Sequence, residues 1–169
     1  MKKRVLVIGS GGAGKSTFAR RLAARLGLPL IHLDRVFWHA GWVETPKGEW
    51  RRKVEELCAG ESWIIDGNYS GTLDVRLEAC DTVIFLDLPH VLCTWRALKR
   101  SVTYRESARP DMAEGCRERI DLKFLYWVWS YPSRRRPKIL ARLDELAGSK
   151  KIYRLSSSAE VERFLEEVR

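Results

Sequence analysis

Several kinds of segment are scarce in this chain of 169 residues, and each scarcity excludes a class of protein. The four cysteines stand far apart without a Cys-x-x-Cys pair, and the three histidines do not cluster with them. This pattern argues against a zinc site or a disulfide framework and favours reduced thiols in the cytoplasm. No apolar run approaches the roughly 20 residues that span a bilayer, so we expect no membrane partner. The apolar run Val5–Ile8 behind the basic start is also too short for a signal peptide.

The glycine-rich run Gly9–Ser16 is the strongest motif that is present. It matches G-x-x-x-x-G-K-[ST] at every fixed position. The segment Arg4–Ile8 before it, which is apolar from Val5 onward, predicts a buried strand. The segment Thr17–Leu26 after it predicts a helix. In such a strand–loop–helix unit, the backbone N–H groups of the loop and the positive end of the helix dipole surround a phosphate. The alternative is an ordinary Gly-rich turn, which the four matched positions in this context disfavour.

The side chains of this P-loop have distinct expected roles. Lys15 would reach the β- and γ-phosphates of a nucleotide, and the Ser16 hydroxyl would ligate Mg²⁺. We therefore expect ATP and Mg²⁺ as cofactors. A GTPase is excluded because guanine recognition in that class uses Asn-Lys-x-Asp, whereas Tyr69 follows Asn68, the only asparagine here. The residues expected to surround the nucleotide phosphates are Gly9, Ser10, Gly11, Gly12, Ala13, Gly14, Lys15, Ser16 and Thr17.

Apolar strands alternate with amphipathic helices along the rest of the chain. This alternation predicts one α/β domain over residues 1–169, a three-layer α/β/α arrangement around a five-stranded, mostly parallel sheet. Residues 35–44 are expected to form an aromatic-rich loop, and residues 103–115, which have no period, a mobile lid. The predicted strands are Arg4–Ile8, Leu30–Leu33, Trp63–Ile65, Thr82–Leu86 and Lys151–Leu155. The predicted helices are Lys15–Leu26, one with Thr45 as N-cap that runs to Cys58, His90–Val102, Arg117–Ser130, Arg134–Leu146 and Ala159–Val168.

Acidic residues stand where predicted strands end, which is where ligands of parallel sheets bind. Asp66 ends the third strand and could hold Mg²⁺ opposite Ser16, as a Walker-B Asp does. The alternative is a surface Asp that caps a turn with Gly67. Asp34 ends the second strand, where an acceptor substrate would approach the γ-phosphate. It could accept the proton of an attacking hydroxyl or join the Mg²⁺ shell, or it could simply be an N-cap.

The net charge of +9 is concentrated in residues 93–138, which contain twelve Lys or Arg and five Asp or Glu. Such a segment implies an anionic partner: the nucleotide, a phosphorylated second substrate, or nucleic acid. Within it, Arg96 and Arg100 share one helix face, and Arg105 and Arg109 follow in the predicted lid. These arginines could neutralise phosphates and close over the substrates, as a kinase requires. The alternative is a solvated basic face.

The cluster Arg134–Arg136 lies between two prolines and also has two interpretations. It could complete a phosphate site or touch nucleic acid, or it could be a charged helix start at the surface. Three positive charges at a helix start are unfavourable for the helix dipole, which hints at an anionic partner. Among the seven tryptophans, Trp38 and Trp42 are placed best to hold a substrate ring, whereas Trp127 and Trp129 are expected in the core.

Together these motifs resemble the adenylate-kinase-like branch of P-loop kinases over nearly the whole chain. The shared pattern is a P-loop, a carboxylate after strand two, an apolar strand ending in Asp-Gly, and Asp-x-Pro followed by Arg-x-x-x-Arg. Within this branch the chain is most similar to bacterial proteins labelled DNA topology modulation proteins. The stretches that carry the closer resemblance are Leu33-Asp34 with Gly41-Trp42, Trp63–Tyr69, Arg109–Met112 and Trp129–Pro132.

The resemblance implies a small five-stranded nucleoside monophosphate kinase-like fold with a donor and an acceptor half. In that fold Asp66 would lie near Mg²⁺, Arg96 would flank the adenine, and Arg100 would bind phosphates. Arg105 and Arg109 would serve as lid arginines. Adenylate kinases continue Asp-Gly with Phe-Pro-Arg, whose arginine holds the monophosphate acceptor, whereas this chain continues with Asn68. The arginine that would bind AMP is therefore missing at this place, and Asn68 could hydrogen-bond a different acceptor.

Two functional hypotheses follow from the sequence. The first is an ATP-dependent phosphotransferase that acts on a small acceptor, such as a nucleoside monophosphate. The second is a nucleic-acid-binding P-loop NTPase that affects DNA topology through the basic segment 93–138. For the first, the residues expected to carry catalysis are Lys15, Asp34, Arg100, Arg105 and Arg109.

Overall fold

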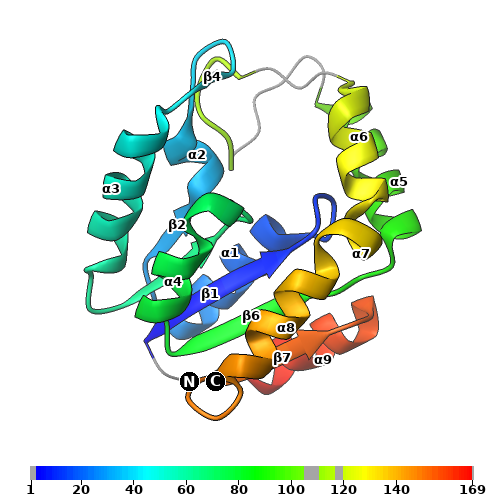
Figure 1. Cartoon of the computed structure of the whole chain (residues 1–169). Coiled ribbons are helices and arrows are strands. Elements are labelled where there is room, and N and C mark those ends of the chain that lie inside the picture. The colour runs from blue at the N-terminus through cyan, green and yellow to red at the C-terminus, as the bar shows by residue number, and fades with distance from the viewer. Residues whose placement is uncertain (1–2, 105–110, 117–119, 169) are drawn as a thin grey trace.

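The computed structural model describes residues 3–104, 111–116 and 120–168, and in these ranges it contains the predicted three-layer architecture (Figure 1). Five strands form one sheet in the order β2-β5-β1-β6-β7, and every neighbouring pair is parallel. The predicted fold class is thus confirmed. The strands of this sheet are β1 (Arg4–Gly9), β2 (Leu30–His32), β5 (Trp63–Asp66), β6 (Thr82–Leu86) and β7 (Lys151–Leu155).

The register of the sheet brings the P-loop and Asp66 to the same edge. β1 is the central strand and is buried from Val5 onward, as expected for a parallel strand covered on both faces. Val7 pairs with Asp66 on one side, and Gly9 pairs with Leu86 on the other. Because the strands are parallel, the P-loop leaves β1 at the edge where β5 ends.

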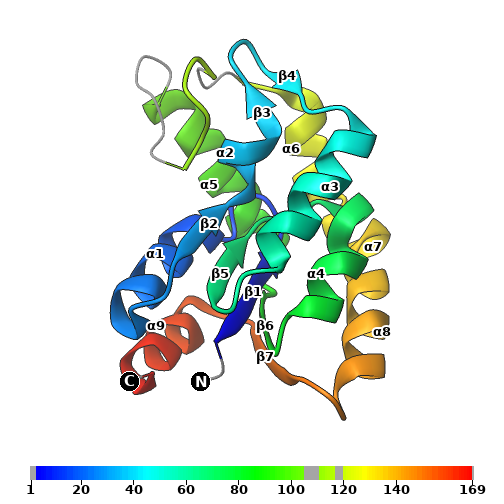
Figure 2. The same ribbon diagram turned by 90° about the vertical axis from the view of Figure 1, so that its left-hand side faces the viewer.

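Helices cover both faces of the sheet and divide the core in two (Figure 2). α1 and α9 lie on one face, and α3, α4 and α8 lie on the other. Among the described helices, none is long and apolar enough to cross a membrane. The helices are α1 (Lys15–Leu26), α2 (Leu33–Phe37), α3 (Lys47–Cys58), α4 (Leu73–Ala79), α5 (His90–Thr103), α6 (Leu122–Trp129), α7 (Tyr131–Arg134), α8 (Arg136–Leu146) and α9 (Ser158–Glu167), with a 3₁₀ turn η1 (Ser70–Thr72).

The segment 35–44, predicted as a loop, is largely regular. β3 (Trp38–His39) and β4 (Val43–Glu44) form a short antiparallel hairpin after α2. Asp34 was also misplaced, because β2 ends at His32 and Asp34 lies in the first turn of α2. The hydrophobic pattern missed these elements because each is shorter than the window over which that pattern can be read, roughly 11 residues for a helix and about 4 for a strand.

The predicted N-cap role of Thr45 is wrong. α3 begins at Lys47 after Pro46, without a side-chain cap. The Thr45 hydroxyl instead donates to the carbonyl of Phe37 at 2.7 Å and lies 3.1 Å from His39 Nε2. Thr45 therefore fastens the β3–β4 hairpin to the end of α2. The Thr45 hydroxyl bonds to Phe37, which precedes it along the chain, instead of to the first N–H groups of α3.

The basic C-terminal half also differs from the prediction in its helix boundaries. α6 begins at Leu122, and the Asp121 side chain caps it by accepting from the N–H groups of Lys123 and Phe124. Residues 117–119, where the predicted helix began, lie outside the described residues. The helix predicted over Arg134–Leu146 is split at Arg135, whose φ of −121° interrupts α7 and α8. α4, between the third and fourth predicted strands, was not foreseen.

Only part of the predicted lid lies within the described residues. α5 extends to Thr103, and residues 111–116 run beside the β3–β4 hairpin (Figure 1). The N–H of Gly41 donates to the carbonyl of Gly115 at 3.2 Å, and the Cys116 thiol donates to the carbonyl of His39 at 3.1 Å. The motion of this segment stays a prediction. Arg105 and Arg109 lie outside the described residues.

Candidate functional site

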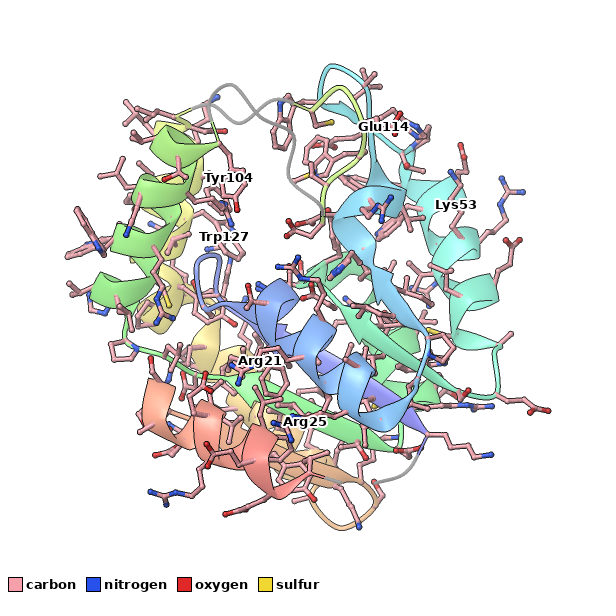
Figure 3. All side chains as sticks on the ribbon, turned by 180° about the vertical axis from the view of Figure 1, so that it is seen from behind. Arg21, Arg25, Lys53, Tyr104, Glu114 and Trp127 are labelled. Atoms are coloured by element: carbon pink, nitrogen blue, oxygen red, sulfur yellow. The ribbon has the colours of Figure 1, made fainter. Side chains whose placement is uncertain are left out.

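A cleft of about 1700 Å³ lies at the carboxyl edge of the sheet, and residues 11–17 of the P-loop and the first turn of α1 belong to its lining. The P-loop and the end of β5 contribute to its lining, together with α2 and the β3–β4 hairpin on one side and α5 and α6 on the other. Figure 3 shows the two walls from behind, with Tyr104 and Trp127 on the α5–α6 wall facing the P-loop side. The cleft therefore contains both the predicted donor region and the predicted acceptor region.

The P-loop has the geometry of an anion-binding turn. Gly14 has a left-handed conformation with φ of 87° and is the N-cap of α1, which begins at Lys15. No acidic residue occupies the first turn of α1, so the positive end of its dipole is uncompensated there. Lys15 Nζ donates to the carbonyl of Ser10 at 3.0 Å, which holds the ammonium across the loop.

The α5–α6 wall packs directly on the P-loop. A Cβ added at Gly12 would lie 2.0 Å from the carbonyl oxygen of Cys93 on α5, so only glycine fits there. At Gly11, an added Cβ would lie 2.6 Å from the Phe124 ring and 2.9 Å from Val128, both on α6. The P-loop is therefore held in shape by helices that come much later in the chain.

Asp66 is almost fully buried at the end of β5 and pairs with a residue that the sequence did not single out. Its Oδ2 lies 2.9 Å from Nδ1 of His32, its direct neighbour in the β2–β5 register. Its Oδ1 has no hydrogen-bond partner within the described ranges, although the carboxylate is only 4% exposed. Asp66 and Ser16 both line the cleft. A buried carboxylate with one oriented oxygen and one unsatisfied oxygen fits a Mg²⁺ ion or one of its waters.

Asp34 is held by the second residue that the sequence reasoning missed. The hydroxyl of Tyr69 donates to Oδ1 of Asp34 at 2.7 Å. Burial and the neighbouring negative charge of Asp34 both raise the pKa of Tyr69, so the phenol stays protonated and remains a donor. This contact joins α2 to the loop that follows Asp66 and fixes where the Asp34 carboxylate lies.

Aromatic rings surround Asp34 and form one wall of the cleft. Phe37 is in ring contact with Trp38, Trp50 and Tyr69, with centroid separations between 4.6 and 5.0 Å. Trp38 also meets Trp42, whose backbone has the unusual φ of 64°. Trp38 and Trp42 both line the cleft, and their predicted role in holding a substrate ring stays a prediction. Trp129, expected in the core, is 52% exposed.

Arg76, a fully buried arginine on α4, braces the loop after Asp66. Its guanidinium donates to the backbone carbonyls of Thr72, Gly67 and Tyr69. Burial lowers its pKa to about 10, which leaves it charged at neutral pH. One side chain thus bonds three backbone carbonyls at once, which fixes the loop that presents Asn68 and Tyr69.

We expect Arg76→Met to destabilise the protein by at least about 3 kcal/mol, because it strands several buried carbonyls and leaves a poorly filled polar site. Urea unfolding followed by circular dichroism measures this change. Arg51→Met is the control, because Arg51 is an exposed arginine on α3 that pairs with Asp74, and its loss should hardly move the midpoint. Equal midpoints for the two variants would contradict the bracing role.

The arginines of the basic segment are distributed over the cleft. Arg96 donates to the Ser158 hydroxyl at 3.2 Å and lies near Gly14, and Arg100 lies over the Phe124 ring with Cζ 5.6 Å from its centroid. Arg134 and Arg135 also line the cleft. The structure therefore brings together most of the predicted site residues. They are the P-loop, Asp34, Asp66, Arg96 and Arg100.

Comparisons with known proteins give relatives of limited similarity. No protein-family model matches the chain. Uncharacterized protein YqaC from Bacillus subtilis (strain 168) is 27% identical over 133 residues, which cover 78% of this chain and 74% of that protein. Adenylate kinase from Mycobacterium leprae is 37% identical over 81 residues, 47% of this chain and 42% of the kinase, so the match spans less than half of that enzyme.

Solved structures resemble the whole chain in fold. Shikimate kinase from Acinetobacter baumannii, in complex with shikimate, has a TM-score of 0.59 at 17% identity and covers 99% of this chain and 91% of its own. A sugar kinase from Janibacter sp. HTCC2649, in an unliganded structure, has a TM-score of 0.50 at 21% identity and covers 98% and 94%. These likenesses concern the arrangement of the backbone. Together with the sheet order and the P-loop, they show that the chain has the three-layer α/β/α fold of P-loop kinases.

Proposed function

We propose that the protein is an ATP-dependent phosphotransferase that passes the γ-phosphoryl group of ATP to a hydroxyl of a small acceptor. The observation that carries this proposal is that Lys15, Asp34 and Asp66 all line the same cleft. A nucleotide-binding loop alone would suit any NTPase. An oriented carboxylate on the facing wall is what a second, hydroxyl-bearing substrate requires.

The donor half consists of the P-loop and the arginines of α5. Residues Gly9 to Thr17 would bind the phosphates, Lys15 would neutralise the charge that develops on the transferred group, and Arg100 would assist it. Arg96, which donates to the Ser158 hydroxyl, would flank the adenine. Arg105 and Arg109 are proposed to join from the lid, which would close over the substrates.

Mg²⁺ fits the donor half through Ser16 and Asp66. When bound, it would supply positive charge that offsets the negative charge of the nucleotide phosphates. In the part of the chain that the structure describes, no group of three or more His, Cys, Asp or Glu could enclose a metal ion. Mg²⁺ typically takes one or two protein ligands and completes its shell with phosphate oxygens and water, which agrees with this sparse set. His32 would act as a positioning residue by fixing the Asp66 carboxylate.

The acceptor half consists of Asp34, Tyr69 and the surrounding aromatic rings. Asp34 would take the proton of the attacking hydroxyl, and Tyr69 would hold the Asp34 carboxylate in place. A nucleoside monophosphate is one acceptor of this kind, in line with the partial match to adenylate kinase. Hydroxylated metabolites are another, in line with the likeness to shikimate kinase and to a sugar kinase.

The position of the basic side chains favours small anionic ligands over nucleic acid. The lining of the cleft includes Arg96, Arg100, Lys123, Arg134, Arg135 and Lys138, all from the basic segment 93–138. A nucleic-acid site would instead need a positively charged surface that follows a phosphate backbone. The alternative function that affects DNA topology has no support in this geometry.

We expect ATP consumption to rise in the presence of one class of acceptor. The experiment is a screen of nucleoside monophosphates and small hydroxylated metabolites with purified protein, ATP and Mg²⁺. Lys15→Ala serves as the control for contaminating activity, because it removes the phosphate-binding ammonium. A screen in which no acceptor raises consumption above the Lys15→Ala background would contradict the proposed phosphotransferase.

A further inference from the structure

Three cations on α7 and α8 line the cleft without forming ion pairs to other residues that the structure describes. Arg134, Arg135 and Lys138, here named the α7–α8 cation cluster, all belong to the cleft lining. Arg135 is half-buried and the other two are exposed. Among the described residues, none of the three has a carboxylate partner. The mechanism proposed above does not use them.

The neighbouring Arg136 behaves differently and provides the contrast. Its Nε donates to Oδ1 of Asp87 at 2.8 Å, and Asp87 also pairs with Arg154. Asp87 and Arg136 line a second, smaller pocket, away from the cleft lining. The helix break at Arg135 separates the two groups, so the triple-arginine sequence divides into one structural cation and two cations directed to the cleft.

Aromatic rings hold the two cleft arginines in place. The Arg135 guanidinium lies 4.8 Å from the Trp127 ring centroid, and that of Arg134 lies 5.5 Å from the Tyr126 ring centroid. Stacking of this kind occupies the flat face of a guanidinium and leaves its N–H edge available to an oxyanion. Lys138 adds a third charge in the first turn of α8, which contains no acidic residue. The positive end of the α8 dipole therefore strengthens the preference for an anion.

The cluster belongs to the acceptor half of the cleft rather than the donor half. α7 begins at Tyr131, which belongs to the same buried hydrophobic cluster as Leu33 of α2, and Tyr69 packs against that cluster. Leu77 of α4 and Ile139 of α8 lie in one buried cluster and both line the cleft. Figure 2 shows α4 between α3 and the α7–α8 pair. The donor phosphates have their own proposed cations in Lys15 and Arg100.

We propose that the α7–α8 cation cluster binds an anionic group of the acceptor, a carboxylate or a phosphate. The acceptor is then a small hydroxylated anion, with its reacting hydroxyl at Asp34 and its anionic group at Arg134, Arg135 and Lys138. This inference rests on the proposed phosphotransferase function, because it assigns the substrate class of the same site. Anion binding does not require turnover, so the two proposals can fail separately.

The test is a binding titration with the P-loop already filled. The full chain is saturated with Mg²⁺ and a non-hydrolysable ATP analogue and is titrated with glycerol 3-phosphate, glycerate or glycerol. Binding is followed by nuclear magnetic resonance through the indole N–H of Trp127, which Trp127→Phe assigns. We expect at least one of the two anions to shift this signal in a saturable way. Neutral glycerol should not shift it. The tighter anion identifies the group as phosphate or carboxylate.

Variants show whether the named cations bind the anion. Arg134→Gln/Arg135→Gln should weaken anion binding at least about tenfold, as expected for the loss of charged hydrogen bonds. Arg134→Gln/Lys138→Gln leaves Arg135 on its ring and should also weaken it. Arg163→Gln removes an exposed charge on α9, outside the cleft lining, and should change nothing. The proposal would be overturned if neither anion bound more tightly than glycerol. It would also be overturned if both double variants bound the anion as tightly as the wild-type protein.

Discussion

Lys15→Ala is expected to lower the rate of phosphoryl transfer by about a hundredfold to a thousandfold, the usual effect of removing one preorganised group that stabilises transition-state charge. The physical reason is that Lys15 lies across the P-loop, where it holds the carbonyl of Ser10 and can turn to the phosphates. The side chain is only half-buried, so its loss should leave the fold intact. Initial rates with the acceptor found in the screen measure the effect.

The control for this variant lies on the same helix. Arg25→Ala removes a positive charge from the far end of α1, away from the P-loop, as Figure 3 shows, and should keep most of the activity. Circular dichroism of both variants checks that each is folded. If Lys15→Ala retained wild-type rates, the P-loop would not bind the transferred group, and the account of the donor half would be wrong.

Gly12→Ala is expected to abolish measurable ATP binding and to lower the melting temperature by several degrees. A Cβ at this position would meet the backbone carbonyl of Cys93 at 2.0 Å, and Gly12 has φ of 75°. The left-handed backbone costs a non-glycine residue about 1–2 kcal/mol, and the clash adds to this because neither α5 nor the loop can yield without losing its packing. Calorimetric titration with ATP and thermal unfolding measure the two effects.

Gly27→Ala separates backbone strain from the clash. Gly27 ends α1 with φ of 64°, and nothing lies within 4 Å of the Cβ that would be added. This variant should lose about 1 kcal/mol of stability, or a few degrees, and should bind ATP normally. Wild-type ATP affinity in Gly12→Ala would show that the contact between the P-loop and α5 does not set the shape of the phosphate site.

The features that the sequence predicted well are those encoded by neighbouring residues. The P-loop is a contiguous motif, and each strand of the sheet is a short apolar run bounded by turn residues. Gly27 ends α1 and Ser157 caps α9 through backbone groups that lie within one helical turn of each residue. Patterns of this kind need no knowledge of which segments meet in space.

The features that it missed depend on tertiary pairing. His32 meets Asp66 only because β2 lies beside β5 in the register that makes them neighbours. Tyr69 reaches Asp34 across 35 positions of sequence. Nothing in the sequence distinguishes Arg76 from an exposed helical arginine, because the carbonyls that it bonds come together only in the folded chain. The sequence likewise does not show that Arg134 and Arg135 line the cleft whereas Arg136 pairs with Asp87, because this difference depends on the helix break at Arg135. Composition alone could locate the basic segment but not the cations that face the cleft.

The most direct measurement of the central claim follows the phosphorus atoms. Wild-type protein, ATP, Mg²⁺ and the acceptor found in the screen are observed by ³¹P nuclear magnetic resonance over time. The account predicts that the lost γ-phosphate signal is matched by one new phosphate-ester signal, with little inorganic phosphate. Release of inorganic phosphate alone, at the same rate with and without the acceptor, would contradict phosphoryl transfer and leave only an NTPase.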